Sequence, residues 1–193
     1  MKLTLACAVL VAVAVAGLYG ADPVPSNDRP QFTKDNQLMR PENYRDWVFL
    51  SSGLGMSYSA QAGSHEMFTN VFAPRWQYDT FMQSGKWPDK SIFVVEERGE
   101  ATRGSINKHG HFQTTEVMGI GVEVKDETRF PEKWAYYAFD DTAKTASPNP
   151  KEGCWQCHED HAAVEHSFVQ FYPTLKPVAQ KFGTYRAERE KVD

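Results

Sequence analysis

Apolar, β-branched and aromatic residues gather in three short runs along the middle of the chain. The runs cover residues 92–95, 117–124 and 134–139. Such runs, followed by charged or turn-forming residues, are typical of strands. The intervals between them are too short and too polar for regular crossover helices, so we expect an antiparallel sheet joined by turns.

Two further strands are expected before these runs, at residues 48–51 and 67–72. The Gly- and Ser-containing stretch between them, residues 53–63, is predicted to be a loop. Residues 142–153 contain Pro and Ser and are predicted to form another loop, after the last strand.

Helical spacing appears around the strands. Residues 41–47 suggest a short helix with Pro41 in its first turn. Residues 74–84 carry apolar residues closer to helical than to strand spacing, and Gly85 is placed to end that helix. A third helix is expected after residue 158, broken by Pro173 and Pro177. The combination predicts an α+β fold.

The segment Cys154-Trp155-Gln156-Cys157-His158 is the most informative motif of the chain. Cys-x-x-Cys-His is typical of covalent attachment of haem c. Cys154 and Cys157 can form thioethers with the two vinyl groups of one porphyrin, and His158 can ligate the iron. The cofactor predicted is therefore a single haem c, attached after the sheet and near the C-terminus.

Two other uses of a Cys-x-x-Cys pair remain open. A zinc site needs two more ligands, which His161 and His166 could supply, but the sequence has no second Cys-x-x-Cys pair. A redox-active or purely structural disulfide in an exported protein is the other alternative.

The N-terminus predicts export. Met1-Lys2 is followed by the apolar run 3–16 and then by a polar, Pro-rich stretch, which indicates a cleavable signal peptide over about residues 1–20. The run is shorter than the roughly 20 residues that span a bilayer, and no later stretch is a better candidate for a membrane span. We expect a periplasmic or otherwise exported protein, with Cys7 discarded in the signal.

The rest of the chain is divided into an extended N-terminal arm, residues 21–40, and one haem-binding domain, residues 41–193. The arm is rich in Pro, Asn, Asp and Gln. Removal of the signal takes away Lys2 and no acidic residue, so the formal net charge changes from −4 to −5. That balance argues against nucleic acid as a partner.

Three further patterns point to one family. They are Pro-Glu-Asn-Tyr-Arg-Asp-Trp-Val-Phe at 41–49, Val-Lys-Asp at 124–126 followed by Arg-Phe at 129–130, and the spacing from His158 to Phe168 and to Phe-Tyr-Pro at 171–173. Small cytochromes c are usually helical and carry the attachment motif near the N-terminus, whereas this motif follows a predicted sheet. The chain resembles the cytochrome P-460 family over most of residues 41–175.

The resemblance implies a five-stranded antiparallel sheet with flanking helices, usually in a homodimer, and a haem c whose distal face has no strong protein ligand. Two activities are known in the family. The P-460 enzymes oxidise hydroxylamine and have a haem cross-linked to a lysine. The related cytochromes c′-beta lack that link and bind gases such as nitric oxide under an apolar cap.

The resemblance places the lysine that distinguishes the two branches on the strand that begins at residue 92. In the family this lysine stands just before a Glu. Alignment of that Glu with Glu96 puts Val95 where the lysine would be. We therefore expect no cross-link. Lys90 is the nearest alternative and requires a changed register.

Strand alternation extends this comparison to the distal pocket. Residues two apart on a strand point the same way, so a haem-facing Val95 places Phe93 and Glu97 on the same face. Phe93 is then a candidate distal cap, with plain core packing as the alternative. Phe72 and Trp87 are weaker candidates for the cap.

A P-460 enzyme also has a distal carboxylate, whose position here falls nearer Gly121, with Glu123 two residues away on the same face. We expect Glu123 to face solvent. If Glu123 faces the iron instead, it is a possible distal carboxylate that could accept a proton from a bound ligand.

The preferred hypothesis is a mono-haem cytochrome with an apolar distal pocket that takes a small neutral ligand, nitric oxide first, because a neutral gas loses little on leaving water. Oxidation of hydroxylamine or nitric oxide is the alternative. Simple electron transfer is a third hypothesis and would need a methionine opposite His158. The candidates for that ligand, none marked by spacing, are Met39, Met56, Met67, Met82 and Met118. The sequence does not indicate a redox partner.

Overall fold

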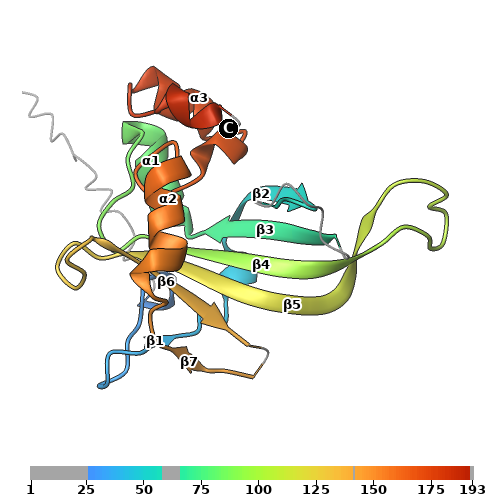
Figure 1. The fold of residues 1–193 in the computed structure, drawn as a ribbon, viewed down its shortest axis with the longest axis horizontal. Helices are drawn as coiled ribbons and strands as arrows, with labels where there is room; N and C mark the ends of the chain where they lie inside the picture. The colour runs from blue at the N-terminus through green and yellow to red at the C-terminus, as the bar shows by residue number, and fades with distance from the viewer. Residues whose placement is uncertain (1–25, 58–65, 141, 192–193) are drawn as a thin grey trace, which may run out of the picture.

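The computed structural model describes residues 26–57, 66–140 and 142–191, so the predicted signal peptide lies outside the described residues. An antiparallel five-stranded sheet forms the centre of the fold, in the order β2-β3-β4-β5-β6 (Figure 1). Its strands are β2 (Val48–Leu54), β3 (Met67–Ala73), β4 (Ile92–Ala101), β5 (Phe112–Lys125) and β6 (Trp134–Phe139). The predicted α+β class and the antiparallel sheet are confirmed.

A second, two-stranded sheet ties the N-terminal segment to the domain. Strand β1 (Leu38–Met39) pairs antiparallel with β7 (Thr145–Ala146), which lies within the predicted loop 142–153. The 3-10 turn η1 (Ser26–Asp28) precedes β1, and the carboxylate of Asp28 accepts hydrogen bonds from Asn43 and Trp47. Residues 26–40 are therefore packed against the fold.

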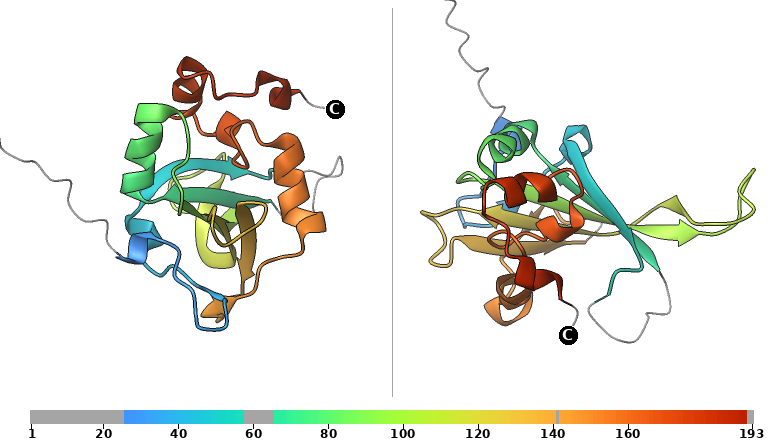
Figure 2. Two further views of the ribbon diagram at one scale, coloured as in Figure 1. Left: turned by 90° about the vertical axis from the view of Figure 1, so that its left-hand side faces the viewer. Right: turned by 90° about the horizontal axis from the view of Figure 1, so that it is seen from above.

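The helical segments are short, and the three α-helices lie on one side of the sheet (Figures 1 and 2). Helix α1 (Arg75–Ser84) follows β3, and α3 (Lys176–Lys181) lies near the C-terminus. Between them, the π-helix η3 (Lys151–Trp155) runs directly into α2 (Gln156–His161). The 3-10 turns are η2 (Tyr44–Asp46), η4 (Val169–Phe171) and η5 (Ala187–Glu190).

Strand alternation gives the sheet two hydrophobic cores. On the helical side, Phe93 and Trp134 pack with Phe81 of α1 and Ala179 of α3. On the other side, alternate residues such as Val94, Val122 and Tyr137 pack with Leu38 and Tyr44 from the N-terminal segment. The continuous apolar runs of the sequence are thus explained by burial of the sheet on both faces.

Two helix predictions are wrong. Residues 41–47 form only the 3-10 turn η2, and residues 162–175 contain turns and η4 in place of the expected helix. Pro177 does not break a helix but lies in the first turn of α3. A backbone N–H there would have no intrahelical acceptor, so proline costs the helix no hydrogen bond. The strands are also longer than predicted, because β4 and β5 continue past the core as a protruding hairpin (Figure 1). In the part of the chain that the structure covers, no helix has the length and apolar character to cross a membrane.

The predicted end of α1 at Gly85 is confirmed and can be tested. Gly85 has a φ of 66°, and an added Cβ would lie 2.8 Å from Cβ of Phe182. We expect Gly85→Ala to lower the free energy of unfolding by about 1–2 kcal/mol from the left-handed backbone, and further from this contact. Gly183→Ala is the matched control, because Gly183 has a φ of 69° with nothing within 4 Å of its added Cβ. Equal losses in denaturant unfolding would contradict a role for the Phe182 contact.

Candidate haem site

The cysteines and the histidine of the attachment motif lie on one helical stretch. Cys154 belongs to η3, and Cys157 and His158 belong to α2. Residues three and four positions apart share a helix face, so the three side chains can approach one flat group from the same side. Both thiols are free and partly buried, and Nδ2 of Asn149 donates to Sγ of Cys154 at 3.3 Å. Among the described residues, no three potential metal-ligating side chains gather around them.

The imidazole of His158 is held on three sides. Its Nδ1 lies 2.7 Å from the backbone carbonyl oxygen of His166. A carbonyl only accepts, so Nδ1 carries the proton. The rings of Tyr136 and Phe168 lie against the imidazole, each with a centroid separation of 4.3 Å. This tautomer leaves the lone pair of Nε2 free, and burial lowers the pKa of His158 to about 4. The ring is therefore neutral near pH 7, as a metal ligand must be.

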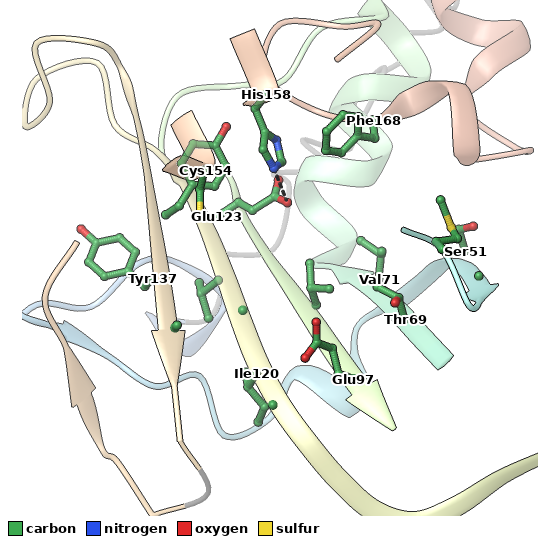
Figure 3. Close-up of a pocket in the computed structure, with 18 of the residues that line it drawn as sticks. Ser51, Thr69, Val71, Glu97, Ile120, Glu123, Tyr137, Cys154, His158 and Phe168 are labelled. Carbon is green, nitrogen blue, oxygen red and sulfur yellow. Dashed lines mark ion pairs between the residues drawn. The ribbon is translucent and has the colours of Figure 1, made fainter. Parts of the chain in front are cut away.

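His158 projects into a cavity of about 410 Å³ between the sheet and the helical layer (Figure 3). The floor of the cavity is a row of small side chains, one from each strand, in which each residue is paired with the next across the sheet. The row consists of Ser51, Val71, Val95, Gly121 and Ala138. Small residues in every strand leave a broad space on which a flat ring can lie.

A second row of the sheet brings a carboxylate into the cavity. Thr69, Glu97 and Gly119 are paired across β3, β4 and β5, and all three line the cavity. A Cβ at Gly119 would lie 2.9 Å from Oε2 of Glu97, so the glycine leaves room for that carboxylate. The expected placement of Glu97 on the same face as Val95 is found, and the lining is less apolar than we expected.

Glu123 corrects another expectation from the sequence. Its side chain is buried instead of facing solvent, and its Oε1 lies 3.8 Å from Nε2 of His158 (Figure 3). The other oxygen, Oε2, has no hydrogen-bond partner among the described residues. Burial raises the pKa of Glu123 to about 8, so at pH 7 this carboxyl and His158 are both neutral and their contact is not an ion pair. The solvent-facing prediction is wrong because both faces of β5 are covered at this point.

The other candidate residues lie at different depths. Val95 lines the cavity, whereas Phe93 is fully buried in the helical-side core, does not line the cavity, and packs against Trp87 and Trp134 at centroid distances of 4.7 and 6.2 Å. Lys90 donates to Asp126 and to the hydroxyl of Thr128, outside the cavity. No lysine occurs among the described residues that line the cavity.

Among the described methionines, Met56 alone lines the cavity. Its sulfur lies against Gly53 of β2, where an added Cβ would collide with it. Met56 is about half exposed. Met56 therefore lies at the rim of the cavity. Of the methionines considered as iron ligands, it is the one that lines the cavity in the described part of the chain.

A model of the cytochrome P460 family matches residues 41–169. The chain belongs to this family. The matched segment contains all five strands of the main sheet and the whole attachment motif. A comparison with curated proteins finds no significant match. Membership of the cytochrome P460 family supports a c-type cytochrome with haem as its cofactor.

The residues present fit that cofactor. A neutral imidazole with a free Nε2, two free thiols and the small-residue floor are what an attached haem needs. The unpartnered Oε2 of Glu123 is a buried polar atom of the kind that a missing group accounts for. Cys154 and Cys157 would hold the haem covalently and His158 would ligate its iron. The sequence indicated these three residues, whereas the rings around His158 and the carbonyl of His166 required the fold.

Proposed function

We propose that the protein is an exported cytochrome P460 family member with one covalent haem c, ligated by His158 and open to a small neutral ligand on its other face. Nitric oxide is the best candidate ligand. One observation carries the proposal. The floor of the cavity, where His158 projects, presents Val71, Val95 and Gly121, none of which has an atom that can ligate iron.

The lining of the cavity supports a neutral ligand. An anion that enters would meet hydrocarbon from the floor and carboxyl groups from Glu97 and Glu123, and would lose its hydration without gaining hydrogen-bond donors. A small uncharged gas has little hydration to lose. The haem supplies the binding of the gas at its iron, and the chain supplies selection by size and charge.

The chain also fixes the orientation of His158, the residue that would ligate the iron. The carbonyl of His166 sets the tautomer of His158, and the rings of Tyr136 and Phe168 limit its rotation and exclude water from it. Held in this way, the imidazole would stay available to an attached haem as its ligand.

Oxidation of hydroxylamine or nitric oxide is the second candidate function. The buried carboxyl of Glu123 favours it, because a carboxyl beside the ligand site could take up a proton from a bound substrate. The lack of lysine among the described lining residues argues against the cross-linked haem of the hydroxylamine-oxidising branch.

Simple electron transfer would need Met56 to move from the rim to the iron. We also propose that the protein forms a homodimer and that it has a separate redox partner.

Filling the floor of the cavity tests the proposed ligand site. We expect Gly121→Leu to slow the binding of nitric oxide to the ferrous protein by about fivefold or more, because overpacking costs about 1–3 kcal/mol and 1 kcal/mol corresponds to a factor of about five. The rate can be measured by stopped-flow absorbance. Val124→Leu adds bulk to the opposite face of the same strand, at a residue that does not line the cavity, and should leave the rate unchanged. An unchanged rate in Gly121→Leu would contradict binding over this floor.

A further inference from the structure

The carbonyl that binds His158 belongs to a short strap, residues 162–167, between α2 and η4. Val164 and Ser167 exchange backbone hydrogen bonds across the strap. Glu165 lies at its turn with a φ of 50°, in the left-handed region that a residue with a side chain rarely adopts. The strap therefore holds an unfavourable conformation, which persists where surrounding contacts determine it.

Arg186 provides those contacts from the C-terminal segment. Its Nη2 donates to the carbonyl oxygens of Ala162 and Glu165, at 2.6 and 2.5 Å, and its backbone N–H donates to the carbonyl of Ala163 at 2.9 Å. Within the described residues, no carboxylate forms an ion pair with Arg186. The hydrogen bonds of its guanidinium are therefore directed at the strap.

Lys125 holds the strap from the sheet side. Its buried Nζ donates to Oε2 of Glu165 and to the carbonyl of Trp87, both at 2.8 Å. The strap is thus clamped between the end of β5 and the C-terminal segment. Lys125 lies within the part of the chain that matches the cytochrome P460 model, whereas Arg186 lies beyond it.

We propose that Arg186 is a positioning residue for the haem ligand. By holding the strap, Arg186 keeps the carbonyl of His166 on the Nδ1–H of His158, and so lowers the reduction potential of the haem. A firm hydrogen bond at Nδ1 makes the imidazole a stronger electron donor, which favours ferric over ferrous iron. This inference rests on the proposed ligation of the iron by His158.

The test is Arg186→Gln in the haem-loaded protein. We expect the midpoint potential to rise and the iron–histidine stretching band of the ferrous protein, measured by resonance Raman scattering, to move to lower frequency. Arg189→Gln is the matched control. It removes the same charge three residues further on, and Nε of Arg189 has no hydrogen-bond partner in the described part of the chain. An unshifted band and potential in Arg186→Gln, or equal shifts in both variants, would overturn the proposal.

Arg186→Lys is a second variant that decides the matter if Arg186→Gln does not accumulate. Lysine keeps the charge but loses the planar fork of donors, so we expect shifts in the same directions and of smaller size. The substitution weakens the hydrogen bonds to the strap, so an unshifted potential and an unshifted band in this variant would count against the proposal. A wild-type protein whose ferrous haem is high-spin but shows no iron–histidine band would instead refute ligation by His158. A low-spin ferrous haem, which gives no such band, would contradict the open site of the proposed function, so the failures are distinguishable.

Discussion

The double variant Cys154→Ala, Cys157→Ala is expected to lose covalent attachment of haem completely. Both thiols are free and lie on the same helical stretch as His158. Without them no thioether can form, and any remaining haem is held by His158 and packing alone. Haem staining after denaturing electrophoresis, together with extraction into acidified organic solvent, measures the effect. We expect a stained band for the wild type and none for the double variant.

Gln156→Ala is the control for this prediction. Gln156 stands between the two cysteines, and its exposed amide donates to Asp160, one turn further along α2. We expect this variant to keep its haem through denaturation. Haem that stays with the denatured double variant would show that attachment does not depend on these thiols.

The second large effect concerns the stability of the haem-free chain, for which the cysteine double variant provides a background. Burial raises the pKa of Glu123 from 4.5 to about 8. Between these values the unfolded chain releases the proton while the folded chain keeps it. The contribution of Glu123 to the free energy of unfolding should therefore fall with rising pH over this interval, by about 1.4 kcal/mol per pH unit. Below the interval, both states are protonated and the cost disappears.

Glu123→Gln removes this titration and keeps the size of the side chain. Relative to its parent, we expect the variant to gain several kcal/mol of stability at pH 8 compared with pH 5, measured by denaturant unfolding at both values. Glu116→Gln changes an exposed carboxylate on the same strand and should show no such difference. An equal effect of Glu123→Gln at both pH values would contradict the buried, protonated carboxyl.

The strands of the central sheet could be predicted from the sequence because their apolar runs are short and bounded by polar turns. The run 134–139 coincides with β6. The ends of β4 and β5 could not be predicted, because beyond residue 96 and before residue 117 the hairpin is polar and lacks the apolar run that marks a strand in the sequence. The helix predicted after His158 failed for a different reason. Its apolar residues face the core from successive turns, so their spacing resembles that of a helix without the backbone of one.

The candidate site shows the same division. Cys154, Cys157 and His158 form a local motif and needed no knowledge of the fold. The burial of Glu123 depends on β6 and the helical layer, which are distant in sequence, so a single charged residue in a strand looked solvent-facing. The hydrogen bond from His158 to the carbonyl of His166 leaves no trace in the sequence, because any residue at that position supplies a carbonyl.

The optical spectrum of the purified ferrous protein, recorded before and after addition of nitric oxide, tests the central claim most directly. The protein should be made in cells that attach haem c. An open site opposite His158 predicts a high-spin haem c spectrum that changes when the gas is added. A low-spin spectrum that does not respond to nitric oxide would contradict the open site and favour electron transfer. A strongly red-shifted Soret band would contradict the absence of a lysine cross-link.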